Sequence, residues 1–299
     1  MRTTVLLAAG AAAFAAFAAD INDWENPAVN SRNRLPARTY SMPLESEQAA
    51  LSDELEPATA YKLSLNGDWK IYWVGDPARR PLDFFRTDFD DSDWATIDVP
   101  SCVEMRGYGI PWYTNIRYPH KNEWPKILDR ETGRGDFNPV SSYRRSFTVP
   151  ENWKGREVIL RFDGVYSAYY VWINGEMVGY AEDSKLASEF DITRFLKDGP
   201  NQIAVQVFRW CDGSYLEDQD MFRFSGIFRD VSIWSRPKGG IWNFAVKTDL
   251  KVERGACSGA TVSVSGIDGE WSAKLYDASK KEVARFSASA SAQALNSAD

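Results

Sequence analysis

Histidine is almost missing from this sequence of 299 residues, because His120 is the only one. A zinc site with several histidines is therefore excluded, and a Ser-His-Asp or Cys-His relay would rest on His120 alone. His120 stands in the polar segment RYPHKNEWP, where we expect a solvated loop histidine. The chain is also mildly acidic. With 35 Lys and Arg against 42 Asp and Glu and no basic stripe, nucleic acid is not an expected partner.

Cysteines and long apolar runs are equally few. Cys102, Cys211 and Cys257 are odd in number and widely spaced, which predicts free thiols or at most one pair and no disulfide framework. The long apolar run covers residues 5–17 and is too short for an ordinary membrane span. We therefore expect no membrane span in the mature chain.

The same run has the features of a secretory signal. Arg2 and the amino terminus give it a positive start, and Ala16-Phe17-Ala18 supplies a small-x-small cleavage pattern. We predict a signal peptide at residues 1–19, cut after Ala18 or Ala19. The mature protein is then expected to be secreted or periplasmic.

Aromatic residues are abundant, with 12 Trp, 13 Tyr and 16 Phe, which favours a β-sandwich and carbohydrate handling over a helical bundle. Asn174-Gly175 separates two aromatic-rich runs and predicts a hairpin with a type I′ turn. Many short strands with turn residues between them predict an all-β fold, an antiparallel sandwich of jelly-roll type. The strand candidates of this sandwich are residues 69–73, 96–99, 143–149, 158–162, 168–173, 176–181, 202–210 and 227–234.

Four segments are predicted along the chain. After the signal, residues 20–66 lack sustained periodicity apart from a short helical piece at 45–56, as expected of an extended arm lying over the main domain. The jelly-roll domain, residues 67–236, ends at the turn-rich SRPKGG. Residues 237–299 hold four strand-like segments, fewer than the roughly seven strands of an immunoglobulin-like sandwich. We expect a partial, truncated domain of that type.

Residues 209–230, RWCDGSYLEDQDMFRFSGIFRD, place five carboxylates among five aromatic rings. Carboxylates bind hydroxyl groups or hard cations, and rings cover the apolar faces of sugars, so the stretch suits a sugar or cation site. The alternative is a sharp loop whose acids pair with Arg209, Arg223 and Arg229. The residues alone leave both interpretations open.

Several stretches resemble the N-terminal third of the large β-galactosidases of glycoside hydrolase family 2. They are DWENPAV (23–29), LNGDWK (65–70), VPSCVEMRGYGIPWYTNIRYP (99–119), FDGVYSAYYVWINGEMVGYAEDSKLASEFDI (162–192) and, the most specific, residues 209–230. The resemblance covers about residues 20–237. It implies a jelly-roll sugar-binding domain, followed in the family by an immunoglobulin-like domain and a catalytic TIM barrel.

The reaction that the resemblance implies is retaining hydrolysis of terminal β-D-galactosyl residues by two glutamates of the barrel. That barrel is not recognisable in this sequence, so we expect no catalytic residue and no glycosidase activity from the chain alone. Asp220 has no evident acid/base partner that would make it a nucleophile. Glu217 and Asp218 are adjacent and would point to opposite faces of an extended chain.

What the resemblance transfers is a supporting role in substrate binding. Asn115 of YTN matches the family asparagine that reaches the galactosyl unit, and Tyr113 lies on the same loop and lines the site. Asp220 matches the aspartate that ligates an active-site Na⁺, whose other protein ligands come from the barrel. Without the resemblance, a turn residue is the simpler interpretation of Asn115.

A structural Mg²⁺ site between the arm and the jelly roll is also implied. Its ligands transfer to Asp23, Asn26, the carbonyl of Val29, Glu182 and Asp212. All supply oxygen, as Mg²⁺ prefers, although this chain has Glu182 where the family commonly has glutamine. The alternative is that these acids cap turns and pair with nearby Lys or Arg.

Two functional classes follow from these observations. The first is a piece of a β-galactosidase, competent only with a barrel supplied in cis or in trans, whose full-length relative is expected to form a homo-oligomer. The second is a free-standing secreted carbohydrate-binding module of the same fold, because fold alone does not determine function.

Overall fold

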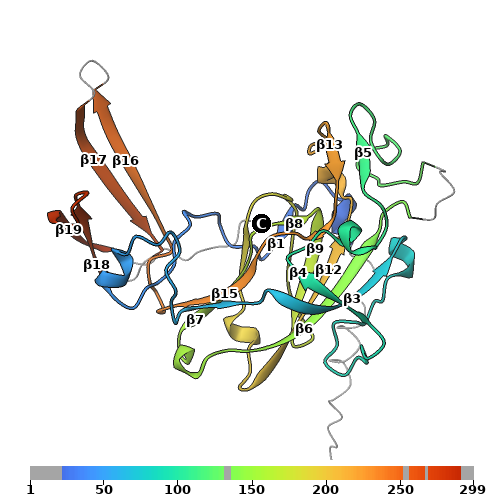
Figure 1. Ribbon diagram of the computed structural model, residues 1–299, viewed down its shortest axis with the longest axis horizontal. Helices are drawn as coiled ribbons and strands as arrows, with labels where there is room; N and C mark the ends of the chain where they lie inside the picture. The colour runs from blue at the N-terminus through green and yellow to red at the C-terminus, as the bar shows by residue number, and fades with distance from the viewer. Residues whose placement is uncertain (1–21, 131–135, 252–255, 267–268, 291–299) are drawn as a thin grey trace, which may run out of the picture.

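The computed structural model describes residues 22–130, 136–251, 256–266 and 269–290 (Figure 1). The predicted signal peptide, residues 1–19, lies outside this range. In the described part of the chain, no helix has the length and apolar character needed to cross a membrane.

The main unit is a jelly-roll sandwich made of a seven-stranded sheet and a four-stranded sheet, and all its strand pairs are antiparallel. The larger sheet has the order β1-β10-β9-β12-β6-β3-β4, and the smaller one β11-β7-β15-β2. The larger sheet consists of β1 (Ser31–Arg32), β10 (Glu176–Ala181), β9 (Ala168–Ile173), β12 (Pro200–Phe208), β6 (Val140–Thr148), β3 (Gly67–Val74) and β4 (Ala95–Val99). The smaller sheet consists of β11 (Ser188–Asp191), β7 (Glu157–Phe162), β15 (Val231–Arg236) and β2 (Lys62–Ser64). The predicted all-β fold is confirmed.

The core lies between the two sheets because alternate residues of each strand point inward. Trp69 and Ile71 of β3, Tyr143 of β6 and Leu160 of β7 are at most 1% exposed. They belong to one large cluster of buried apolar side chains contributed by both sheets. The rich supply of aromatic and β-branched residues therefore fills the sandwich, as the composition indicated.

The turn between β9 and β10 is the hairpin that the sequence predicted. Ile173 pairs with Glu176, so Asn174 and Gly175 form a two-residue turn. Both have positive φ, 52° and 88°, as a type I′ turn requires. The Asn174 amide also donates to the Phe195 carbonyl at 2.8 Å, which ties the turn to the neighbouring loop.

The N-terminal arm is packed against the sandwich. It contains the 3₁₀ turn η1 (Asp23–Glu25), the edge strand β1 and the helical turn α2 (Glu47–Ala50). Trp24 stacks on Phe208 of β12 with ring centroids 4.2 Å apart. Arg38, almost fully buried, forms an ion pair with Glu189 of β11 at 2.7 Å.

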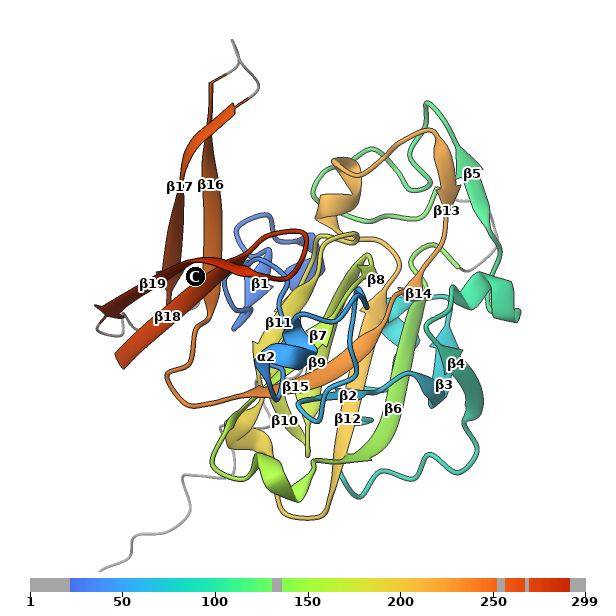
Figure 2. The same cartoon turned by 60° about the vertical axis from the view of Figure 1, so that its left-hand side comes forward.

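Beyond β15 the chain forms two hairpins, β16 (Asn243–Lys251) with β17 (Ala256–Ser265) and β18 (Gly269–Tyr276) with β19 (Glu282–Ala290). Trp242 stacks on Trp234 of β15, and the Thr39 hydroxyl donates to the Phe244 carbonyl at 2.8 Å. In Figures 1 and 2 these hairpins stand on one side of the sandwich, and β5 with β13 on the other.

Two element predictions needed correction. The expected strand 227–234 is divided into β14 (Gly226–Ile227) and β15, because residues 228–230 leave the strand path and β14 pairs separately with β8 (Val165–Tyr166). The helical piece expected at 45–56 is only the four-residue α2. The remaining short elements are η2 (Pro77–Arg79), η3 (Val103–Arg106), β5 (Trp112–Thr114), η4 (Glu151–Trp153), η5 (Thr193–Phe195), η6 (Asp212–Tyr215) and β13 (Met221–Arg223).

Candidate functional site

A small two-stranded ribbon, β5 paired with β13, carries the predicted sugar-contacting residues. The register pairs Tyr113 with Phe222 and Thr114 with Met221. Asn115 directly follows β5 and Asp220 directly precedes β13, so both lie at the same end of the ribbon. The Tyr113 hydroxyl donates to the Asp220 carboxylate at 2.5 Å. The structure thus brings Tyr113 and Asn115 to the same end of the ribbon as Asp220, which lies more than a hundred positions later in the sequence.

This ribbon tip, defined as Tyr113, Asn115, Asp220 and Phe222, is open to solvent. Tyr113 is 53% exposed and Phe222 57%, with their ring centroids 5.5 Å apart. Asn115 and Asp220 are exposed as well. The tip therefore offers an amide, a carboxylate and two aromatic faces, which are groups that can bind a hydroxyl-rich ligand or a cation.

Buried charges lie beneath the tip. Arg223 forms an ion pair with Asp218, and its guanidinium also donates to the Thr114 hydroxyl at 3.4 Å. Arg209 contacts Glu104, Nε to Oε1, at 3.4 Å. The side chains of Arg223, Arg209 and Glu104 are at most 2% exposed. The ion-pair interpretation of residues 209–230 therefore holds for Asp218 with Arg223.

The other basic residues of that interpretation pair differently. Arg209 takes its partner, Glu104, from outside residues 209–230. The Arg229 guanidinium donates to the Lys185 carbonyl at 2.7 Å. Glu217 accepts hydrogen bonds from the backbone amide and hydroxyl of Ser184. Glu217 and Asp218 thus have separate partners, as expected of neighbours that face opposite ways. Sequence reasoning missed Glu104, because nothing local shows that it lies under the ribbon.

A second group of acids, the arm-side cluster, lies where η6 meets the end of β10. It consists of Glu182, Cys211 and Asp212, whose ligand atoms lie within 4.8 Å of one another. All three residues are buried; Glu182 is 8% exposed and Asp212 is 4% exposed. Gly213 leaves space beside them, since a Cβ there would stand 3.0 Å from Glu182 Oε2. Cys211 is a member that the sequence did not predict.

Burial sets the electrostatics of the arm-side cluster. Loss of solvation raises the pKa of Glu182 and of Asp212, and the nearby Asp212 carboxylate raises that of Glu182 further. The Tyr180 hydroxyl, itself buried, donates to Glu182 Oε1 at 2.5 Å. Two neighbouring acids in so dry a place favour either a shared proton or a bound cation.

The arm supplies its predicted ligands unequally. Asp23 is buried, but its carboxylate is held by Arg32 through two bonds of 2.7 and 2.8 Å. Asn26 is exposed, and its side-chain oxygen accepts from the backbone of Ala28 at 3.2 Å. η1 packs against η6, so the arm residues lie near the cluster. The structure therefore unites Glu182 with Asp212 and leaves Asp23 paired with an arginine.

The prediction for His120 was wrong. His120 is 2% exposed; its ring stacks on Tyr118 at a centroid distance of 5.5 Å and meets Tyr215 in a T-shaped contact at 4.5 Å. Its Nδ1 faces the Lys121 carbonyl at 3.1 Å, while Nε2 is buried and has no partner among the described residues. Trp210 and Tyr215, which are distant in sequence, pack against the ring and help to bury a segment that looked like a polar loop.

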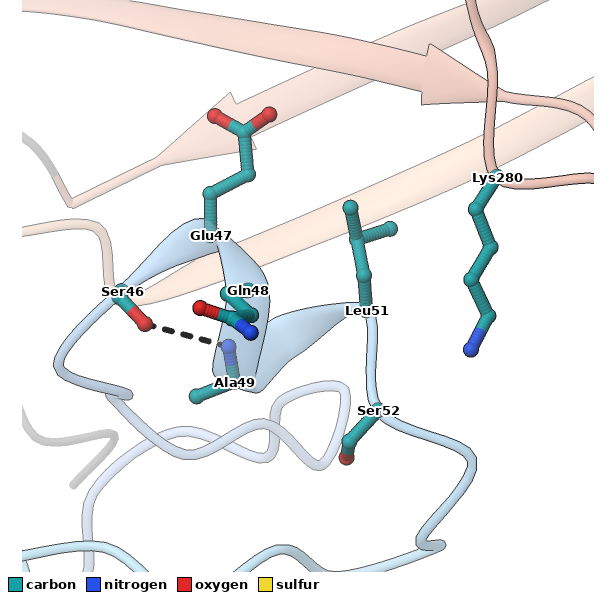
Figure 3. A pocket seen from close by; sticks show the side chains of 7 residues that line it. All are labelled: Ser46, Glu47, Gln48, Ala49, Leu51, Ser52 and Lys280. Atoms are coloured by element: carbon teal, nitrogen blue, oxygen red, sulfur yellow. Dashed lines mark hydrogen bonds between the residues drawn. The ribbon is translucent and has the colours of Figure 1, made fainter.

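A shallow hollow lies elsewhere, beside α2 (Figure 3). Its lining includes Ser46, whose hydroxyl accepts from the Ala49 amide at 3.2 Å, and Lys280 on the turn between β18 and β19. The hollow contains none of the predicted site residues. Cys102 and Cys211, the cysteines whose side chains are described, are free thiols; Cys257 lies outside the described side chains.

Comparison with known proteins places the chain in a family. Residues 63–237 match the family described as "Glycosyl hydrolases family 2, sugar binding domain". The chain belongs to glycosyl hydrolase family 2. This range holds the ribbon and the arm-side cluster, while the arm up to residue 62 precedes it.

Named relatives in family 2 support the resemblance. A protein of *Priestia megaterium* named "Beta-galactosidase" is 40% identical over 270 residues, covering 87% of this chain and 26% of that protein. Another of *Psychromonas ingrahamii*, with the same name, is 42% identical over 228 residues, covering 76% of this chain and 21% of that protein. The chain thus spans about a quarter of the length of these relatives.

Solved structures of family 2 proteins share the fold. A β-glucuronidase from an uncultured *Clostridium* gives a TM-score of 0.54 at 20% identity, over 79% of this chain and 40% of that one. A β-glucuronidase of *Bacteroides uniformis* gives 0.54 at 24% identity, over 76% and 25% respectively. At such low identity they support the architecture alone.

Proposed function

We propose that the chain is the N-terminal, sugar-binding portion of a β-galactosidase that hydrolyses terminal β-D-galactosyl residues. The observation that carries the proposal is the β5–β13 pairing, which brings Asn115 and Asp220 to one end of the ribbon with the Tyr113 hydroxyl bonded to Asp220. Relatives with 40–42% identity that are named "Beta-galactosidase" favour galactose over other sugars.

The ribbon tip then has a defined role. The Asn115 amide exchanges hydrogen bonds with galactosyl hydroxyls, and the Tyr113 and Phe222 rings cover the sugar's C–H surface. Asp220 accepts from a hydroxyl and would be one ligand of a Na⁺ ion, whose other protein ligands would come from the catalytic barrel. We assign no catalytic residue to this chain, since the paired glutamates of retaining hydrolysis belong to that barrel.

The donor set at the arm-side cluster fits a Mg²⁺ ion in part. Glu182 and Asp212 supply buried carboxylates side by side. Asp23, Asn26 and the Val29 carbonyl would complete the site from the arm, and Asp23 would then divide its charge between the ion and Arg32. Such an ion would neutralise the two acids and join the arm to the jelly roll.

Further parts of the proposal concern the protein's setting. The apolar start of the sequence supports export to the periplasm or the exterior. The expected partners are a β-galactoside and the catalytic barrel, in cis or in trans, within a homo-oligomer.

Galactose binding and turnover test the proposal. The chain should bind galactose weakly in saturation-transfer NMR, because half of the hydrogen-bond partners are absent, and should not hydrolyse a chromogenic β-galactoside. Asn115→Ala and Asp220→Ala should remove the NMR signal with unchanged thermal midpoints, since both side chains are exposed. Asp198→Ala, an exposed acid on the β11–β12 connection, should leave the signal intact.

Two outcomes would contradict it. Micromolar affinity for galactose would favour a free-standing carbohydrate-binding module. Turnover that scales with protein concentration, and that Asn115→Ala abolishes, would show catalysis within the chain.

A further inference from the structure

The ribbon that carries the tip is too small to hold its own shape. β5 and β13 are three residues each, and the faces of Tyr113 and Phe222 are open to solvent. An isolated two-stranded hairpin is marginally stable at best in water. Something beyond the ladder must therefore fix the separation of Asn115 and Asp220.

The Arg223 side chain spans the ribbon from below. It is 1% exposed, and its guanidinium serves acceptors on separate segments: the Asp218 carboxylate, the Met221 carbonyl at 2.7 Å and the Thr114 hydroxyl at 3.4 Å. Thr114 directly precedes Asn115, while Asp218 and Met221 flank Asp220. One buried group thus contacts the chain on both sides of the tip.

Arg223 is in turn connected to the sandwich. Arg209, which follows β12, donates to the Arg223 carbonyl at 2.7 Å and to the Ile110 carbonyl, just before β5, at 3.0 Å. Glu104 contacts Arg209 and accepts from the backbone amide and hydroxyl of Ser225, at 2.9 and 2.6 Å. The base of each strand is therefore fixed to the core.

We propose that Arg223 is a positioning residue, which sets the distance between Asn115 and Asp220 and thereby allows the ribbon tip to bind a sugar. The inference rests on the proposed function of the tip. A planar guanidinium with several fixed donors suits this task, whereas the single ammonium of lysine would satisfy Asp218 and leave Thr114 unbridged.

The experiment uses the full chain with Arg223→Met, Arg223→Lys and Arg161→Met. Arg161 is the matched control, because its largely buried side chain pairs with Asp163 and Glu189 on the smaller sheet, away from the ribbon. Hydrogen exchange is followed for peptides covering residues 112–116 and 218–224 and, for comparison, for β9 and β12. Galactose binding is followed by saturation-transfer NMR at a temperature where every variant is folded.

In Arg223→Met, ribbon amides should exchange at least about tenfold faster while β9 and β12 keep their protection. The galactose signal should fall several-fold. Compared with Arg223→Met, Arg223→Lys should restore most of the thermal stability. It should restore less of the protection of ribbon amides from exchange and less of the galactose signal. Arg161→Met should lower the thermal midpoint and leave the ribbon and the galactose signal unchanged.

Unchanged ribbon exchange in Arg223→Met would overturn the inference, as would loosening spread evenly over the sandwich. A loosened ribbon with an undiminished galactose signal would overturn it too. If the wild type gives no galactose signal, the proposed function fails, and the positioning role of Arg223 in sugar binding is overturned with it. If the wild type gives a signal that Asn115→Ala and Asp220→Ala abolish but Arg223→Met leaves undiminished, only the inference about Arg223 is overturned.

Discussion

The ribbon tip and the arm-side cluster use the same chemical groups in opposite surroundings. At the tip, Asp220 is exposed and accepts one hydrogen bond from an exposed tyrosine. In the cluster, Glu182 and Asp212 are buried, and burial raises the pKa of both. Water solvates the tip carboxylate, but the cluster carboxylates depend on protein groups or an ion for compensation.

The difference separates the functional roles of the two regions. Substitution at the solvated tip should change ligand binding with little effect on folding. Substitution among buried charges should change folding, because an unmatched charge there remains desolvated. The same contrast holds inside the ribbon itself, between its exposed tip and the buried Glu104–Arg209 pair at its base.

The largest expected effect comes from breaking that buried pair. Glu104→Ala leaves Arg209 without its carboxylate in a site where both side chains are at most 2% exposed. Loss of one partner of such a pair costs about 3–5 kcal/mol of unfolding free energy. Urea unfolding measures it, with Asp98→Ala, which breaks the exposed pair with Arg106, as a control that should change little. Equal effects of the two substitutions would contradict the contrast between buried base and solvated surface.

The next effect concerns Mg²⁺ at the arm-side cluster. If the cluster binds the ion, Mg²⁺ at about a hundred times its dissociation constant should stabilise the fold by about 2–3 kcal/mol relative to chelator. Asp23→Ala combined with Asp212→Ala should abolish this response, while Asp220→Ala at the tip should keep it. Thermal unfolding in chelator and in millimolar Mg²⁺ provides the measurement. The same response in wild type and in the double variant would exclude the site.

The smallest effect is a pH dependence from His120, which packs against Trp210 and Tyr215. Burial lowers the pKa of His120 below its ordinary value of 6.5, so the folded protein favours the neutral ring. The contribution of the buried neutral ring to folding stability is fully present above pH 6.5. It is lost as the pH falls toward the lowered pKa, because the unfolded chain binds the proton first. The nearby charges of Asp218 and Arg130 oppose one another in their effect.

His120→Phe keeps a ring among Tyr118 and Tyr215 and removes the proton site. The urea midpoint of the variant should therefore decline less steeply than that of wild type between pH 7 and pH 5. Parallel declines in the two proteins would assign the acid sensitivity to carboxylates alone.

Local sequence predicted the elements whose signals are local. Asn174-Gly175 specified its turn because positive φ at both positions is a property of those two residues. The strands β9, β10 and β12 were likewise predicted from their apolar runs. The expected strand 227–234 failed because its interruption depends on β14 pairing with β8, sixty residues earlier.

The candidate site divides in the same way. Asn115, Asp220, Glu182 and Asp212 were found through motifs that resemble a family. The pairing of Asp23 with Arg32 corresponds to the alternative in which these acids pair with nearby Lys or Arg. Two features were not predicted: the bridge from Arg223 to Thr114 and the burial of His120. Each depends on which distant side chains come close after folding, and no short-range pattern in the sequence encodes that.

The arm has one more consequence, through the two residues of β1. Ser31 and Arg32 pair with Ala181 and Tyr180, so they cover part of the free edge of β10. An uncovered edge of a large sheet presents unpaired amides and carbonyls that can recruit the same edge of another molecule. β10 lies beside the aromatic-rich β9, a combination prone to such contacts. The arm therefore shields part of this edge from other molecules. We expect a chain whose arm detaches to become less soluble before it becomes less folded.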